Sequence, residues 1–319
     1  MTKKFSGLQL KMIATISMLL DHIGAVILEA IILQTYPSVR TTENINAWLS
    51  ISSNQLLFSS LEILRLLGRF AFPLYAFLLV EGFLHTKNVT KYAINLGVFA
   101  AISEIPFNLA SRHKIFAFDY QNVFWTLFLA LLCLIAINEL GEKKNWSPRI
   151  SFLSYPVGGV SLGFALFFFY DKLLYQYIGL TTLDIVLVGI LGSILMFIFT
   201  RKKDAAWKNR LIFTVLPIIA CAYISYLLKS DYCVWGIFMI ATMYLLRFNK
   251  TFAFGVGCIT LGMISQNELV ALLMLPIISL YNGERGKTIN KYLFYGFYPL
   301  HLALLSLIAY LTNISSFSI

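Results

Sequence analysis

Long apolar runs separated by short polar segments form the dominant pattern along this chain. A helix that crosses a bilayer needs about 20 largely apolar residues. Runs of this kind occupy the segments 8–33, 64–84, 91–110, 120–139, 150–170, 183–200, 211–229, 232–247, 252–264, 267–281 and 292–312. The pattern predicts an all-α fold, a polytopic transmembrane helical bundle of ten or eleven spans. The runs at 252–264 and 267–281 are short, so they fit tilted spans, half-helices or one bent hairpin.

The composition agrees with a membrane protein. Of the 319 residues, 59% are hydrophobic and only 13% are charged, whereas a soluble domain carries about 25% charged residues. The four cysteines share no short spacing and lie in apolar runs, which favours buried thiols over a metal site or a disulfide framework. The basic, apolar N-terminus lacks a small-residue cleavage site, so we expect an uncleaved first span. No linker divides the chain, and residues 1–319 are predicted to form a single domain.

The positive charges indicate how the spans are oriented. With the N-terminus in the cytoplasm, most of the 25 lysines and arginines fall in segments that the eleven spans place inside. The C-terminus is then outside. The net charge of +10 is explained by this orientation, and no basic stripe on a polar domain suggests a nucleic-acid partner.

Polar residues gather at one level of the predicted bundle. The centre of the first span reads SMLLDHIGAVI and carries Asp21 and His22 side by side. Ionisable residues within a membrane are rare and usually face the bundle interior or a wet cavity. The predicted orientation brings further polar residues from other segments towards the outer half, with the last of them near mid-span: Arg65, Arg69, Glu104, Asn108, Gln121, Asn122, Asp231, Glu268 and His301. Polarity at helix ends explains Gln121 or Asp231 equally well, and a structural ion pair with Arg69 is an alternative for Asp21.

A second polar group is predicted on the inner side. Glu81 and His85 are four residues apart at the end of the second span, and Lys87 and Lys91 follow. These residues, with the basic run RKKDAAWKNR, would attract an anionic, phosphate-rich cytosolic donor. A membrane interface rich in snorkelling lysine and arginine is the alternative.

Six stretches resemble the TraX family of bacterial membrane proteins. They are LKMIATISMLLDHIGAVIL, LRLLGRFAFPLYAFLLVEGFLHTKN, KYAINLGVFAAISEIPFNLA, QNVFWTLFLALL, DYCVWGIFMIATMYL and KYLFYGFYPLHLALL, in this order. The segment 140–230 carries little of the signature. Cys233 stands where the family pattern has a glycine after Asp-Tyr, which affects local helix packing.

The resemblance implies a membrane-embedded acyltransferase in a bacterial cytoplasmic membrane. The family's name-giving member is implicated in N-terminal acetylation of pilin, so acetyl-CoA is the implied donor and no metal is expected. The acceptor would be a polypeptide or an envelope glycan. Onto the matching positions we carry His22, Asp21 and Glu104 as catalytic residues. The implied substrate-binding or oxyanion residues are Arg69, Asn108, Gln121, Asn122, Asp231 and His301, and the implied donor-binding residues are Glu81 and His85. The positions of Arg65 beside Arg69 and of Lys87 beside His85 add these two residues to the same groups.

Acyl transfer needs a base for the nucleophile and a stabilised oxyanion. His22 is the candidate base, or else an acyl-carrying nucleophile. Because neighbours on a helix diverge by about 100°, Asp21 is not expected to orient His22. We expect Glu104 or Asn108 to do so, with Asp21 paired to an arginine. The arginines or the Gln121–Asn122 pair would polarise the acyl carbonyl, and His301 would line the donor path.

Two other functions fit the same residues. A small-molecule transporter or flippase would use buried acids for coupling, but inverted repeats and paired broken helices are not evident. A non-catalytic membrane subunit of a secretion or pilus system would be favoured by long soluble loops, and the longest predicted loop, 34–63, is modest.

Overall fold

The computed structural model describes residues 4–36, 38, 41–141, 205–287 and 289–314. Every regular element within these ranges is a helix, and six helices are long and apolar enough to cross a membrane. The expected all-α membrane fold is therefore confirmed, whereas the number of spans stays a prediction. The expected spans 150–170 and 183–200 lie outside the described residues.

The described residues fall into two compact units. One contains the chain up to Leu131 and from Ser225 onward, and the other runs from Leu132 to Ile224. The single-domain organisation stays a prediction. All the candidate site residues belong to the first unit.

The first span is one helix with a local change of geometry. α1 (Gly7–Ile23) begins at a capping box, in which Ser6 Oγ accepts from Gln9 N–H and the Gln9 side chain accepts from Ser6 N–H. These contacts satisfy two of the backbone donors that every helix start leaves open. The helix continues through a π-helical turn, η1 (Gly24–Leu28), into α2 (Glu29–Thr35). The expected span at 8–33 thus corresponds to a continuous helix of 29 residues.

The segment expected to be a loop before the second span is mostly helical. α3 (Thr42–Leu49) is followed by α4 (Ser52–Gly68), and after a two-residue break the chain continues as α5 (Ala71–His85). The prediction of a loop over 34–63 was therefore wrong, whereas the expected span 64–84 lies within the longer apolar helical stretch Ser52–His85. Serine, asparagine and glutamine at the start of α4 lower its hydropathy without preventing helix formation. Arg65 lies in the last turn of α4, about 20 Å from its start, and therefore within the candidate span Ser52–His85 and not at its end.

The remaining described helices fill the expected segments. They are α6 (Val89–Arg112), α7 (Val123–Gly141), α10 (Ala205–Leu228), α11 (Cys233–Leu245), α12 (Lys250–Leu261), the 3₁₀-helix η2 (Gln266–Met274), α13 (Leu275–Ser279) and α14 (Lys291–Leu311). The elements from α11 to α13 are shorter than the six long spans. This agrees with the short apolar runs expected at 252–264 and 267–281.

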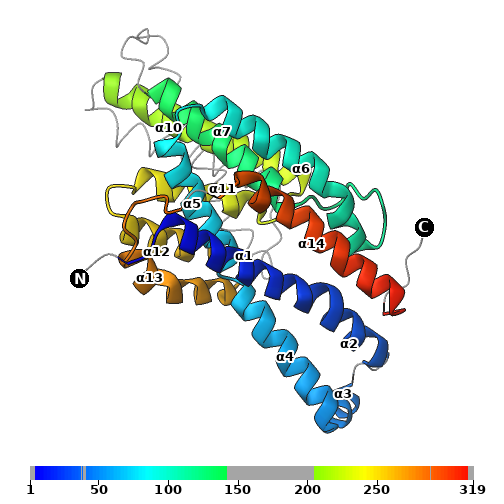
Figure 1. Ribbon diagram of the computed structural model, residues 1–319. Coiled ribbons are helices and arrows are strands. Elements are labelled where there is room, and N and C mark those ends of the chain that lie inside the picture. The colour runs from blue at the N-terminus through cyan, green and yellow to red at the C-terminus, as the bar shows by residue number, and fades with distance from the viewer. Residues whose placement is uncertain (1–3, 37, 39–40, 142–204, 288, 315–319) are drawn as a thin grey trace, which may run out of the picture. The chain divides into compact units, whose positions relative to one another are not determined.

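Within the first unit, α1 lies at the centre of the packing (Figure 1). It contacts α4, α5 and α14, while α14 also packs along α6, and α11 packs on α12 and α5. Leu10 and Ala14 of α1 are completely buried. On α6, by contrast, the apolar residues Ile94, Val98 and Ile102 are exposed and form a stripe at four-residue spacing. Such a stripe is typical of a helix face turned to lipid.

The closest approach of α1 to α4 occurs at Gly68, the last residue of α4. A Cβ atom added there would overlap the Asp21 carboxyl group. One turn earlier on α1, Ser17 Oγ donates to the carbonyl of Leu67. The absence of a side chain at Gly68 therefore leaves room for the Asp21 carboxyl group, which pairs with Arg65 of α4.

We predict that Gly68→Ala lowers the free energy of unfolding by about 1–3 kcal/mol, the usual cost of overpacking. Thermal unfolding of the detergent-purified protein measures this. Gly296→Ala on α14 is the matched control, because its added Cβ would meet only Leu300 Cδ1 at 3.9 Å. Equal unfolding temperatures for the two variants would show that the approach at Gly68 has no energetic consequence.

Candidate active site

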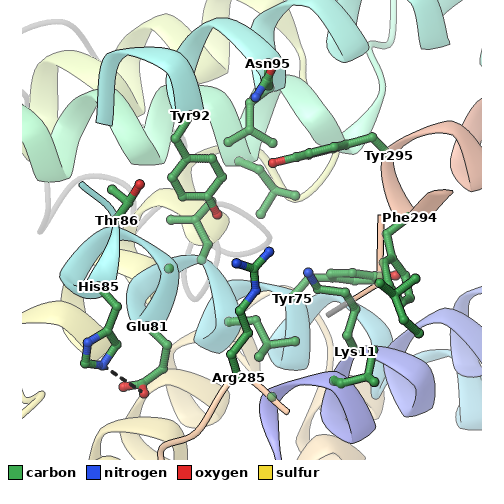
Figure 2. A pocket seen from close by; sticks show the side chains of 18 of the residues that line it. Lys11, Tyr75, Glu81, His85, Thr86, Tyr92, Asn95, Arg285, Phe294 and Tyr295 are labelled. Atoms are coloured by element: carbon green, nitrogen blue, oxygen red, sulfur yellow. Dashed lines mark ion pairs between the residues drawn. The ribbon is translucent and has the colours of Figure 1, made fainter. Parts of the chain in front are cut away.

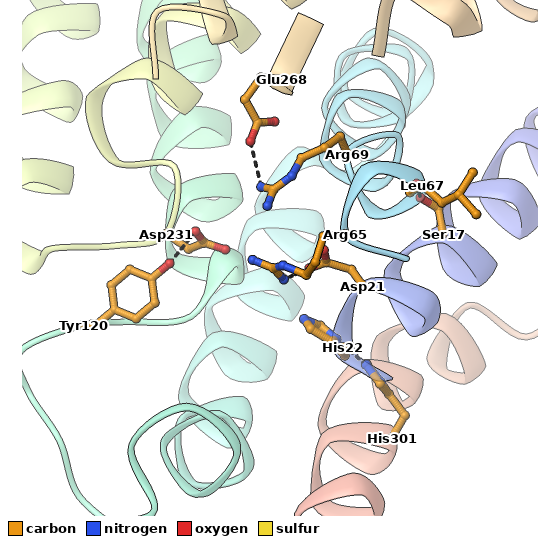
Figure 3. Close-up of polar contacts among 10 residues, drawn as sticks. All are labelled: Ser17, Asp21, His22, Arg65, Leu67, Arg69, Tyr120, Asp231, Glu268 and His301. Carbon is orange, nitrogen blue, oxygen red and sulfur yellow. Dashed lines mark hydrogen bonds and ion pairs between the residues drawn. The ribbon is translucent and has the colours of Figure 1, made fainter. Parts of the chain in front are cut away.

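A pair of histidines joins the first and last helices of the unit (Figure 3). His22 Nδ1 lies 2.6 Å from His301 Nε2, and the two rings stack with their centroids 4.8 Å apart. His301 Nδ1 lies 2.7 Å from the backbone carbonyl oxygen of Phe297, one turn earlier on α14. The phenol ring of Tyr298 packs edge-on against both imidazoles. This pairing of two of the expected site residues was not predicted, since His301 was expected to line the donor path.

The contacts of the pair determine where its protons lie. A carbonyl oxygen can only accept, so His301 must carry its proton on Nδ1 and present a lone pair on Nε2. His22 must then donate from Nδ1 to that lone pair. In a neutral His22 the Nε2 atom is consequently unprotonated and available as a base. The tautomers of both histidines are thus assigned from their hydrogen-bond partners.

His22 is also placed immediately before the π-helical turn. The Glu29 N–H donates to the carbonyl of Gly24, five residues back, in place of the usual four. Turns of this kind occur frequently at functional sites. In the sequence, Gly24 is the single residue that could have indicated the π-helical turn.

Two ion pairs lie beside the histidines. Arg65 Nη1 contacts Asp21 Oδ2 at 2.9 Å, as expected for one of the two arginines. Arg69 Nη1 contacts Glu268 Oε1 at 2.7 Å, and the Glu268 side chain is only 3% exposed. Arg69 was expected as an alternative partner of Asp21, so its actual partner is a correction. Glu268 was expected at this level of the bundle, but the sequence does not specify which of the acids at one level an arginine meets.

Asp231 lies in the turn before α11, next to these ion pairs (Figure 3). Tyr120 donates to Asp231 Oδ1 at 2.6 Å, and the Tyr232 N–H donates to the same oxygen at 2.9 Å. Burial raises the pKa of the Asp231 carboxyl, and the two hydrogen bonds oppose this shift. The backbone N–H of Asp231 also donates to the carbonyl of Gln121 at 2.9 Å. Asp231 and Gln121 thus hold the start of α7 against the start of α11.

Glu104 serves a different contact from the one expected. Its Oε1 accepts from the Asn122 side chain at 2.5 Å, from Asn122 N–H at 3.1 Å and from Trp125 Nε1 at 2.9 Å. Asn108 donates to the carbonyl of Ile115 at 3.4 Å. Glu104 therefore fastens α6 to the start of α7, Asn108 holds the segment that follows α6, and neither contact orients His22. The prediction was wrong because the depth of a residue along its helix does not specify the face on which it lies.

Tyr298 also lines a cavity of about 580 Å³. Figure 2 shows part of its lining. The cavity extends from the turn between α5 and α6 and the segment before α14 to Met18, Phe124 and Tyr298. The expected donor-binding residues Glu81, His85 and Lys87 all line it. Its size is within the range of pockets for small molecules and cofactors, about 300–1,000 Å³. Tyr298 therefore separates the cavity from the histidine pair with a single side chain.

The cavity lining carries a large excess of positive charge. Its cationic residues are Lys11, Lys87, Lys91, Arg285 and Lys287, with His85 beside them. Among the described lining residues the only carboxylate is Glu81, and Lys250 binds it at 2.6 Å, with His85 at 3.8 Å. Lys11 and Arg285 were missed by the sequence reasoning, which assigned one to a span and counted the other as a topology signal. The described residues include no group of three or more His, Cys, Asp or Glu side chains that could hold a metal ion.

Comparison with known proteins now gives the family. The family model described as TraX protein matches residues 6–214 and 185–309. The chain belongs to the TraX family. A curated protein of Dichelobacter nodosus, "Probable fimbrial assembly protein FimC, serogroup H1", is 27% identical over 311 residues, which cover 94% of each chain. No solved structure matches this chain.

The proton positions in the TraX-family histidine pair can be tested by ¹⁵N magnetic resonance of histidine-labelled protein. The chain has only four histidines, so single substitutions assign every signal. We predict that neutral His22 and His301 both carry the proton on Nδ1. A neutral His22 that carries its proton on Nε2 would contradict the assignment.

A further prediction concerns Arg69. Arg69→Leu leaves the buried Glu268 carboxylate without its partner, and we expect a loss of about 3–5 kcal/mol in the free energy of unfolding. The double variant Arg69→Leu/Glu268→Gln should recover part of this loss, because the unpaired charge is gone. Arg112→Leu is the control, since its ion pair with Asp119 is exposed and such pairs contribute about 0–1 kcal/mol. A double variant no more stable than Arg69→Leu would contradict the argument.

Proposed function

We propose that this protein is an acyltransferase of a bacterial cytoplasmic membrane, which passes an acetyl group from cytosolic acetyl-CoA to an acceptor polypeptide or envelope glycan. The observation that carries the proposal is the state of the histidine pair. The chain from His22 through His301 to the Phe297 carbonyl leaves His22 Nε2 as a free base. This base lies behind Tyr298, at the end of a cation-lined cavity.

In this mechanism His22 acts as the general base. Its Nε2 takes the proton of the acceptor amine or hydroxyl while the acceptor attacks the carbonyl carbon of the thioester. The tetrahedral intermediate then collapses, the carbon–sulfur bond breaks, and His22 returns the proton to the departing thiolate. The His22 imidazolium that exists between these steps still donates from Nδ1 to His301. This contact spreads the transient charge over two rings.

The neighbouring arginines support the same reaction by their positions. Asp21 holds Arg65 at 2.9 Å, in the layer that contains His22. A guanidinium fixed in this way is suited to stabilising a developing oxyanion, because preorganised charge needs no rearrangement during the reaction. Asp21 is thus a positioning residue for Arg65 in this proposal, rather than a partner of His22.

The proposal is tested with labelled acetyl-CoA, purified protein in nanodiscs, and envelope fractions separated into protein and glycan. We expect His22→Gln to reduce acetyl transfer by about 10²- to 10⁴-fold, the usual contribution of a general base. His113→Asn is the control, because it removes a histidine outside the pair and retains a residue tolerant of the left-handed backbone there. Unchanged transfer by a well-folded His22→Gln protein would refute the catalytic role of His22.

A second function is favoured by the name of the Dichelobacter relative, a probable fimbrial assembly protein. By analogy, the chain would act as a membrane subunit in fimbrial assembly without chemistry of its own. The same His22→Gln variant separates the two. A non-catalytic subunit would support normal fimbriation after this substitution, whereas an acetylating enzyme would leave the acceptor unmodified.

A further inference from the structure

Two cationic side chains converge inside the cavity without a counter-charge. Lys11 comes from the second turn of α1 and Arg285 from the segment between α13 and α14, and both line the cavity. Figure 2 shows that their charged ends point into the same space. Arg285 is close enough to Lys11 to repel its charge. None of the ion pairs formed by the described residues involves either of them.

The backbone holds these two charges together. The N–H groups of Gly7 and Leu8 donate to the carbonyls of Glu284 and Arg285, at 2.8 and 3.0 Å. Gly286 has φ +78°, and a Cβ atom there would lie 2.7 Å from Ser6 Oγ. The loop therefore closes tightly on the start of α1, and only a glycine suits this position. The fold maintains a repulsive arrangement, which a bound anion would convert into an attractive one.

The rest of the lining does not neutralise them. Glu81 is the only carboxylate among the described lining residues, and it already forms an ion pair with Lys250. Lys250 is an added cation at the edge of the cavity. The unsatisfied charge of the lining is therefore positive, and Lys11 and Arg285 are the two cations whose charged ends meet inside the cavity.

We propose that Lys11 and Arg285 form a phosphate subsite, which binds the phosphate or diphosphate group of the acyl donor. An arginine fork can contact two phosphate oxygens at once, and a lysine adds a compact charge beside it. This deepens the proposed function and rests on it for the identity of the donor. From the subsite the cavity continues along α14, past Tyr295 to Tyr298. A carrier anchored by its phosphates would direct its acyl end towards His22.

Phosphate recognition can be measured by binding alone. Calorimetry of the nanodisc protein with coenzyme A, adenosine 3′,5′-bisphosphate, inorganic pyrophosphate and pantetheine separates the phosphate groups from the thiol arm. We expect Arg285→Gln and Lys11→Met each to raise the Kd for coenzyme A and pyrophosphate by about tenfold to a hundredfold, the effect of losing one charge-assisted contact. Pantetheine, which has no phosphate, should bind weakly and equally to all variants.

Arg247→Gln is the matched control. Arg247 likewise lies in a segment between two helices, α11 and α12, but it packs on the Tyr244 ring and does not line the cavity. Its removal changes the net charge by the same amount, so an equal loss of affinity in this variant would show a general charge effect and overturn the subsite. Unchanged affinity for coenzyme A in Arg285→Gln and Lys11→Met, or no binding of coenzyme A by the unmodified protein, would overturn it as well.

Two further outcomes identify the source of the phosphate and separate this proposal from catalysis. If a short-chain phosphatidic acid displaces pyrophosphate but coenzyme A does not, the site recognises a lipid headgroup and the donor assignment is wrong. His22→Gln should bind coenzyme A as tightly as the unmodified protein. If the unmodified protein binds coenzyme A but transfers no acetyl group, the proposed function is refuted and the subsite stands. If the unmodified protein transfers acetyl groups and Arg285→Gln binds coenzyme A as tightly, the subsite is refuted and the proposed function stands.

Discussion

A charge enclosed among apolar helices requires a partner, and this requirement organises the first unit. Removing an ion from water has a large cost, which a nearby opposite charge and further hydrogen bonds must offset. Arg65 meets Asp21 and Arg69 meets Glu268, so α4 is tied both to α1 and to the η2 segment. At Gly68 the two helices leave space only for the Asp21 side chain, which forms the ion pair with Arg65. The histidine pair lies next to these ties, on a scaffold that they hold rigid.

The two polar regions of the unit treat charge in opposite ways. Around His22 each described acid is hydrogen-bonded or ion-paired, and the histidines satisfy each other without a net charge. In the cavity the cations are held in place while their charge is left uncompensated. The first arrangement suits a proton that moves back and forth, and the second suits a charged molecule that arrives and leaves. Tyr298, which contacts both His22 and the cavity, is where the two regions meet.

Most of the fold could be predicted because a bilayer restricts the possible structures to very few. Apolar runs located the helices α1, α6, α7 and α14 well. The prediction failed at α4, because hydropathy reports burial in lipid and says little about the helicity of a mixed sequence such as SSNQLLFSSLEILRLLG. For the site, the sequence indicated which residues are polar at depth but not which ones meet. His301 makes the contact with His22 that was expected of Glu104, and Glu104 binds Asn122 and Trp125 instead, since the rotation of each helix about its axis depends on tertiary packing.

The π-helical turn after His22 has a consequence for how this helix can vary between relatives. A π-turn contains one residue more than the α-helical turn it replaces, so η1 holds a single extra residue between two regular stretches. A relative that lacks one residue between 24 and 28 would keep Asp21 and His22 in the same register against Arg65 and His301. The part beyond the turn, from Glu29 onward, would also keep its orientation, because a regular α-helical turn would replace the π-helical turn and only the extra residue would be lost. A sequence alignment through this helix should therefore accept a one-residue gap here, although gaps within a transmembrane helix are normally a sign of misalignment.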